Sequence, residues 1–442
     1  MLALLIGTVY CANLWLSAKG LVWPTLVLVL ALFSSVVVVA LYPTARRYLP
    51  ALFILSVIGF PQYLPDPYAP EFVAPFKFAK FVALGCLFLM FKPAPSRGGV
   101  VFLALLIVAT CVAAFKGKTG NIEAEIWYVL FIVVGLNTKC RLEFANSANL
   151  LLSALERLFY LLIPLAIFTR ATGLHDERAG ETVVYFYGHW VGIVTAFAIY
   201  AGFSRQSVVF SSSWIRISFL IITIFVCMAS YQSAHFVLFI IAVSIAIYQR
   251  SHRGGGISTI LLPSVGLVSM LAVGAIILAR AETDTWLYLK ISQVYLLGSG
   301  NFMEAGNSVL IRISQLLSIL EQGTVWSILF GSGVFSTYLA SGAYWDAVVF
   351  HEATFPEREI LAGELQYIHE SVVMLLKWGG LVGLGLACLG AFRLRKSAFV
   401  DRGTAILVAT VFIMFFASSL QTGLLVTGLF VLSMGFSRHA SN

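Results

Sequence analysis

The chain has 442 residues, of which 60% are hydrophobic and 11% are charged. Soluble globular domains carry about 25% charged residues, so this composition excludes a soluble protein and favours one that crosses a membrane repeatedly. The formal net charge of +8 does not indicate nucleic-acid binding. The basic residues separate apolar spans, and they form no basic face with interleaved aromatic residues.

Apolar spans of roughly 15 to 22 residues recur through the whole sequence, and a helix of this length crosses the hydrocarbon core of a bilayer. The predicted spans are 2–17, 21–42, 48–61, 77–91, 100–115, 124–137, 148–169, 186–203, 214–230, 235–249, 257–279, 370–391, 403–418 and 420–436. We therefore expect an all-α polytopic membrane protein with about 12–14 transmembrane helices. Residues 1–442 are predicted to form a single integral membrane domain.

The distribution of basic residues predicts the orientation, because short cytoplasmic loops retain Lys and Arg. If the predicted spans alternate in direction, one side collects Arg46, Arg47, Lys92, Arg97, Lys139, Arg141, Arg250, Arg253, Arg393, Arg395 and Lys396. Both termini are then cytoplasmic, and the loops at 62–76, 170–185 and 280–369 face the periplasm. Lys116 and Lys118 also fall on the periplasmic side and are exceptions to the rule.

The periplasmic loop at 280–369 is too long to be a simple connector and is expected to be partly helical. Apolar residues recur at helical spacing around Arg312, namely Val309, Leu310, Ile313, Leu316, Leu317 and Leu320. This pattern predicts an amphipathic helix that lies along the membrane surface. Gly331 and Gly333 follow, and we expect them to break this helix and form a tight turn.

His369 and Glu370 stand at the outer end of the apolar helix predicted at 370–391. A histidine in this position can titrate near neutral pH and act as a general base, with Glu370 assisting. Gly380 and Gly383 follow on the same predicted helix face, where small residues allow another helix to approach closely. The alternative interpretation is an interfacial histidine without a catalytic role.

Arg312 is a candidate for binding an anion. A guanidinium can hold a phosphate through two parallel hydrogen bonds, which a lysine cannot match. The alternative interpretation is an arginine that extends to lipid headgroups and anchors the surface helix.

Two further outer segments contain candidate substrate-binding residues. Arg178 lies in the loop at 170–185, and His189 follows at the start of the next span. Together they indicate an anionic ligand, although a solvated loop would explain them equally well. His235 ends a polar segment between two spans, where polar side chains are costly unless they pair or line a cavity. A short hairpin is the alternative there.

The order of these features resembles the O-antigen ligase and polymerase superfamily. The resemblance rests on Arg178 with Gly180, Arg312 in its helix, the turn with Gly331, Gly333 and Phe335, and His369 followed by Gly380 and Gly383. It covers roughly residues 170–390 by motif and the whole chain by topology. The chain departs from the family pattern at Glu370, where asparagine is usual, and at 230–235, which lacks the arginine of a Ser-Arg pair.

The resemblance implies a metal-independent glycosyltransferase with a GT-C-like helical fold and no cofactor, acting at the periplasmic face of the bacterial inner membrane. It implies His369 and Glu370 as catalytic residues and Arg312 and Arg178 as ligands of a pyrophosphate. His189, His235, Gly331 and Gly333 are further candidate substrate-binding residues. The implied partners are undecaprenyl-pyrophosphate-linked glycans, membrane lipids, a chain-length regulator and a flippase.

Within this superfamily we favour a polymerase of O-antigen or related polysaccharide repeats. The alternative is a ligase that transfers the lipid-linked glycan to lipid A core, a class we associate with about twelve spans. A transporter of lipid-linked oligosaccharides is a rival from another class. Transporters tend to contain inverted repeats and midplane ionisable residues, whereas here no such repeat is visible and the candidate residues gather on one predicted face.

Overall fold

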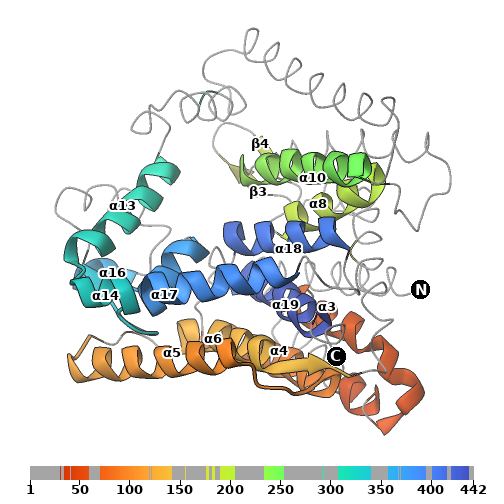
Figure 1. Ribbon diagram of the computed structural model, residues 1–442, viewed down its shortest axis with the longest axis horizontal. Coiled ribbons are helices and arrows are strands. Elements are labelled where there is room, and N and C mark those ends of the chain that lie inside the picture. Colours follow the sequence, from red (N-terminus) through yellow and green to blue (C-terminus); the bar gives the residue numbers. More distant parts are fainter. Residues whose placement is uncertain are drawn as a thin grey trace.

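The computed structural model describes, with short gaps, residues 30–58, 70–141, 190–204, 233–252, 307–339, 357–394, 401–415 and 420–437, together with short pieces at 155, 176–178, 182–184 and 292. This part of the chain is mostly helical, and many of its helices run roughly side by side (Figure 1). The helices are η1 Pro43–Tyr48, α3 Leu49–Ile58, α4 Pro70–Met90, α5 Arg97–Phe115, α6 Ile122–Asn137, α8 Trp190–Phe203, α10 Ser233–His252, α13 Asn307–Gln322, α14 Val325–Phe330, α16 Glu357–Ala362, α17 Ser371–Leu394, α18 Arg402–Phe415 and α19 Leu420–Ser437.

Short antiparallel strand pairs connect some of these helices. The strands are β1 Phe91–Pro93 with β2 Thr138–Cys140, β3 Asp176–Arg178 with β4 Thr182–Val184, and β5 Tyr338–Leu339 with β6 Glu364–Leu365. The hydropathy pattern did not predict them, because two or three extended residues between helices carry too little periodicity to detect.

Several described helices coincide with predicted spans, namely α3, α4, α5, α6, α8, α10, α17, α18 and α19. The predicted spans at 2–17, 214–230 and 257–279, nearly all of 148–169 and most of 21–42 lie outside the described residues. Within the described part, two helices are long and apolar enough to cross a membrane, Arg97–Phe115 and Ser371–Gly390.

The helices pack in successive layers. The pair α8 and α10 packs against α18, α18 packs against α17 and α19, and these in turn pack against α5 and α6 (Figure 1). Aromatic contacts join the layers: the Phe412 and Phe430 rings stack at 4.2 Å, and Phe53 meets Phe131 edge-to-face at 6.2 Å. Such pairs add stability beyond the burial of apolar area.

The outer surfaces of α5 and α17 remain apolar. Val108 and Phe115 of α5 are 62% and 95% exposed, and Leu381 and Leu389 of α17 are more than half exposed. Exposed apolar surface of this extent marks contact with another apolar phase, and lipid hydrocarbon suits helices of this length.

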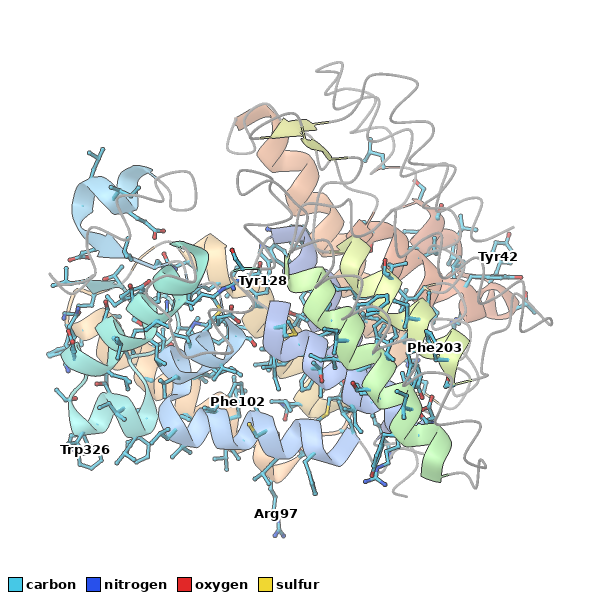
Figure 2. The ribbon with its side chains drawn as sticks, turned by 90° about the horizontal axis from the view of Figure 1, so that it is seen from above. Tyr42, Arg97, Phe102, Tyr128, Phe203 and Trp326 are labelled. Atoms are coloured by element: carbon cyan, nitrogen blue, oxygen red, sulfur yellow. The ribbon has the colours of Figure 1, made fainter. Side chains whose placement is uncertain are left out.

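The antiparallel helices α5 and α6 separate the basic residues into two groups. Lys92 of β1 pairs in register with Lys139 of β2, close to Arg97 at the start of α5. At the opposite end, the Thr337 amide donates to the Lys118 carbonyl at 3.3 Å. The segment with Lys116 and Lys118 therefore lies at the same end as α13 and α14, where Figure 2 shows Trp326.

The helix predicted at 370–391 is not one straight helix. Gly380 interrupts α17 with φ 61° and ψ −161°. The prediction that Gly380 and Gly383 share a face with residue 369 assumed regular helical geometry, and this assumption fails at the kink. The predicted close approach of another helix does occur, because the backbone of Leu329 in α14 lies directly against Gly380.

The amphipathic helix around Arg312 is present as α13, but it ends earlier than the turn glycines. It stops at Gln322, and α14 begins after Thr324, whose hydroxyl accepts a hydrogen bond from the Ser327 amide at 3.2 Å. Gly331 and Gly333 therefore end α14 and not α13. The polar residues Ser314, Gln315 and Ser318 of α13 face inward and are buried, whereas Leu320 is exposed.

Candidate functional site

Arg312 and Glu370 are brought together by the fold although they are far apart in sequence. The Arg312 Nε atom lies 2.7 Å from Glu370 Oε1, and the two side chains are 40% and 25% exposed. The ion pair is therefore half-open to its surroundings. This contact links the amphipathic helix α13 to the segment that immediately precedes α17.

Burial and the Arg312 charge have opposite effects on the pKa of Glu370. Burial raises the pKa of Glu370, and the nearby Arg312 charge opposes that rise without cancelling it. The Arg312 Nε atom is itself buried and, among the described residues, makes no aligned hydrogen bond, so its contact with Glu370 is an ion pair without a directed N–H donor. The pairing therefore rests on charge attraction alone, so a second anion can compete for the same guanidinium.

Strand β5 holds α13, and therefore Arg312, in place. The buried Tyr338 side chain is hydrogen-bonded to Gln315, which lies one turn after Arg312. The Leu339 amide donates to Gln322 Oε1 at 3.0 Å at the end of the same helix. Burial raises the pKa of Tyr338 above its ordinary value.

Glu370 lies in a short segment between β6 and α17 that is held on both sides. The Gln366 amide donates to Glu359 Oε2 at 2.9 Å. The Glu370 carbonyl accepts from the Met374 amide at 2.9 Å, which closes the first turn of α17. Strand β6 pairs with β5 through Tyr338 and Leu365, so the supports of Glu370 and Arg312 are joined.

The turn glycines pack against helix backbones. Gly331 has φ 86° and Gly333 has φ 96°, a region in which residues other than glycine are strained. A Cβ at Gly331 would overlap the Trp378 carbonyl group, and one at Gly333 would overlap the backbone at Ala109. The turn therefore fits between α17 and α5, which gives both glycines a packing role; substrate binding by them stays a prediction.

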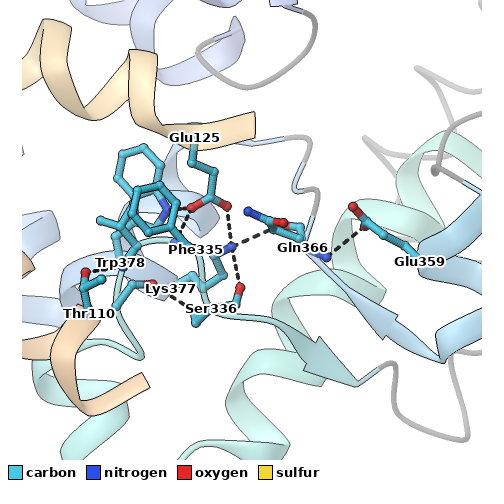
Figure 3. A network of polar contacts seen from close by, with 10 residues as sticks. Thr110, Glu125, Phe335, Ser336, Glu359, Gln366, Lys377 and Trp378 are labelled. Atoms are coloured by element: carbon cyan, nitrogen blue, oxygen red, sulfur yellow. Dashed lines mark hydrogen bonds and ion pairs between the residues drawn. The ribbon is translucent and has the colours of Figure 1, made fainter. Parts of the chain in front are cut away.

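A buried ion pair beside this turn was missed by the sequence analysis. Lys377 Nζ lies 2.6 Å from Glu125 Oε1, and both side chains are almost fully buried (Figure 3). The signal was available, because Lys377 and Glu125 are isolated charges inside the predicted spans 370–391 and 124–137, and ionisable residues within spans usually pair and often mark functional sites.

The remaining predicted site residues are not placed by side-chain geometry. His369 and His189 lie outside the described residues. Arg178 belongs to β3, where it pairs in register with Thr182, and His235 belongs to the first turn of α10; for both, the backbone alone is described. The catalytic role of His369 and the assignment of Arg178, His189 and His235 as substrate ligands stay predictions.

The described part of the chain contains no group of three or more His, Cys, Asp or Glu residues that could hold a metal ion. What the arrangement offers is a half-exposed guanidinium beside a carboxylate that accepts a proton more readily than usual. A guanidinium of this kind can stabilise a phosphate, and a carboxylate with a raised pKa can receive a proton.

No family model, curated protein or solved structure matches the chain.

Proposed function

We propose that this chain is a polytopic, GT-C-like glycosyltransferase that polymerises undecaprenyl-pyrophosphate-linked oligosaccharide repeat units. In this proposal it acts at the periplasmic face of the bacterial inner membrane and needs no metal. The observation that carries the proposal is the ion pair between Arg312 and Glu370, at the end of the helix bundle that also holds α14 and the turn glycines. The resemblance to the O-antigen ligase and polymerase superfamily supplies the reaction class.

The proposed reaction is a displacement at the anomeric carbon of the donor sugar. The bond between this carbon and the pyrophosphate oxygen breaks, and undecaprenyl pyrophosphate leaves with the electron pair. A hydroxyl oxygen of the acceptor sugar forms the new bond to the same carbon, and its proton passes to His369. Glu370 assists as a second proton acceptor, which its raised pKa favours.

Arg312 supports this chemistry as the group that stabilises the leaving pyrophosphate. Negative charge develops on the leaving oxygen as the bond breaks, and a prepositioned guanidinium stabilises that charge. The Arg312 side chain is 40% exposed, so it is accessible to a lipid-linked head group. Arg178 is proposed as the second cation for the same pyrophosphate.

In this proposal the pyrophosphate displaces Glu370 from Arg312, because both anions are attracted to the same guanidinium charge. The same movement would release the carboxylate for proton transfer. In this proposal, the departure from asparagine at position 370 therefore couples donor binding to the availability of a base.

Reconstitution with defined substrates tests the proposal. The purified protein would be incubated with lipid-linked single repeats, with and without lipid A core, and the products separated by size. A ladder of polymers formed without core supports the polymerase; transfer that needs core supports the ligase instead, and no transfer under either condition rejects both.

A comparison of the unmodified protein with the His369→Ala variant tests the assignment of His369 as the general base. The His369→Ala variant should form no ladder while it reaches the membrane at the abundance of the unmodified protein. A normal ladder from this variant would remove His369 from the catalytic residues.

A further inference from the structure

The buried pair of Lys377 and Glu125 has contacts that stability alone does not explain. Their charged atoms lie 2.6 Å apart, and their side chains are 1% and 2% exposed. Removing two charges from water costs free energy. Proteins in which well-packed apolar residues replace a buried ion pair are often equally stable or more stable. The contacts of the pair therefore indicate a role in positioning the segments around it.

The Lys377 ammonium uses its three donors on three separate segments. Besides Glu125, it donates to the Ser336 carbonyl at 3.0 Å and to the Gln366 carbonyl at 3.1 Å (Figure 3). An ammonium has three N–H donors, so the set is complete. Lys377 thus joins the segment before β5 to the segment after β6.

Glu125 completes the same junction from α6. Its Oε2 atom accepts from the Phe335 amide and from Trp378 Nε1, both at 2.8 Å. The carboxylate therefore fixes the end of the glycine turn against α17, whose Lys377 carbonyl also accepts from the Ser332 amide at 2.7 Å. The contact between Lys377 and Glu125 and their four other hydrogen bonds therefore all lie where the glycine turn, the segment after β6 and α17 meet.

The two segments that Lys377 joins are the supports of the candidate site. Ser336 leads into Tyr338, whose side chain is bonded to Gln315, one helical turn from Arg312. Gln366 leads, four residues later, to Glu370. Through these two segments, the buried pair therefore supports both members of the Arg312–Glu370 contact.

We propose that Glu125 and Lys377 are positioning residues that set the contact between Arg312 and Glu370. This inference rests on the proposed function, because it gives that contact a role in binding a pyrophosphate and in proton transfer. Loosening the junction releases Glu370 from Arg312 and leaves the guanidinium free for an external anion. It also misplaces the catalytic segment, and misplacement by about 1 Å can cost about 10²-fold in rate.

The test is the double variant Glu125→Gln/Lys377→Met, which removes both charges and leaves neither one unpaired. Calorimetric titration with inorganic pyrophosphate should show about tenfold tighter binding, while the rate of ladder formation falls about 10²-fold. Adding Glu370→Gln should give no further gain in pyrophosphate affinity, because contacts that act as one unit are not additive. If the pair served stability alone, the double variant would lower the abundance of folded protein without binding pyrophosphate more tightly.

Lys377→Arg is the second variant, because it keeps the positive charge. It should reach the membrane as folded protein even if the double variant does not. It should shift pyrophosphate affinity and rate in the same directions. Lys92→Met is the control, because Lys92 lies in β1 and pairs with Lys139 beyond the far end of α6, whereas Glu125 is near the start of that helix. It should leave both quantities unchanged.

The outcomes separate the two proposals. If the Glu125 and Lys377 variants bind pyrophosphate and form ladders like the unmodified protein, the positioning role is overturned and the anion site stands. If Arg312→Gln binds pyrophosphate as well as the unmodified protein does, the anion site itself fails, and the positioning role falls with it.

Discussion

Arg312 of α13 and Glu370, the residue before α17, form an ion pair with 2.7 Å between Nε and Oε1. The pair joins the two sequence features that independently suggested an anion site and a general base. It also means that the Arg312 guanidinium is paired with a carboxylate of the chain itself.

Replacing Glu370 with glutamine should strengthen anion binding. The variant removes the competing charge and keeps a side chain of the same size, so inorganic pyrophosphate should bind about tenfold more tightly, equivalent to about 1.4 kcal/mol. Isothermal titration calorimetry on the purified protein measures the change. An unchanged or weaker affinity would show that Glu370 does not occupy the anion site.

Replacing Arg312 with lysine should slow polymerisation by about 10²–10³-fold, because the planar donor fork is lost although the charge remains. The rate of ladder formation at saturating substrate measures this effect. Arg402→Lys is the matched control, since Arg402 lies over the Tyr248 ring on other helices. Equal losses from both variants would argue against a specific role for Arg312.

Gly380 and Gly383 should respond differently to alanine. At Gly380, with φ 61°, a Cβ would overlap the backbone of Leu329, so Gly380→Ala should destabilise the protein by at least about 2 kcal/mol. At Gly383 the nearest atom would be 3.7 Å away, and alanine there should be neutral or stabilising by up to about 1 kcal/mol. Thermal unfolding in detergent compares the two variants, and equal stabilities would contradict the kink.

Asp401 should contribute stability that is lost in acid. Burial opposes its ionisation, but hydrogen bonds from Thr404, Tyr200 and Gln249 outweigh burial, so the pKa of Asp401 lies below its ordinary value. A depressed pKa in the folded state stabilises the fold above the unfolded-state pKa, and this contribution disappears as the pH falls through the folded-state pKa.

The Asp401→Asn variant isolates this charge, because asparagine can still cap the start of α18. The unmodified protein should unfold at a higher temperature than the variant at about pH 6, and the difference should shrink toward about pH 3. A difference that is constant over this range would show that the carboxylate charge adds nothing.

The two ends of the α5–α6 pair should lie on opposite sides of the membrane. In a variant without native cysteines, Lys118→Cys should react with a membrane-impermeant maleimide added outside spheroplasts, and Lys92→Cys should react only after permeabilisation. The expectation follows from their positions at opposite ends of α5 and α6. Labelling of both residues from the same side would contradict the proposed orientation.

The sequence by itself determined much of the helical layout. Apolar runs such as 100–115 and 403–418 predicted α5 and α18 closely, because the length needed to cross a bilayer and the burial of side chains act on the composition of each segment. The same local information predicted the amphipathic helix around Arg312, since its periodicity lies within a few turns of chain.

Only the tertiary structure decided which of these features meet. The contact of Arg312 with Glu370 and the burial of Glu125 against Lys377 join residues that are far apart in the chain, and no local pattern encodes such pairings. The kink at Gly380 also escaped prediction, because a glycine within an apolar run is compatible with a regular helix until another backbone packs against it. Composition thus selected the helices, whereas close packing between distant segments created the candidate site.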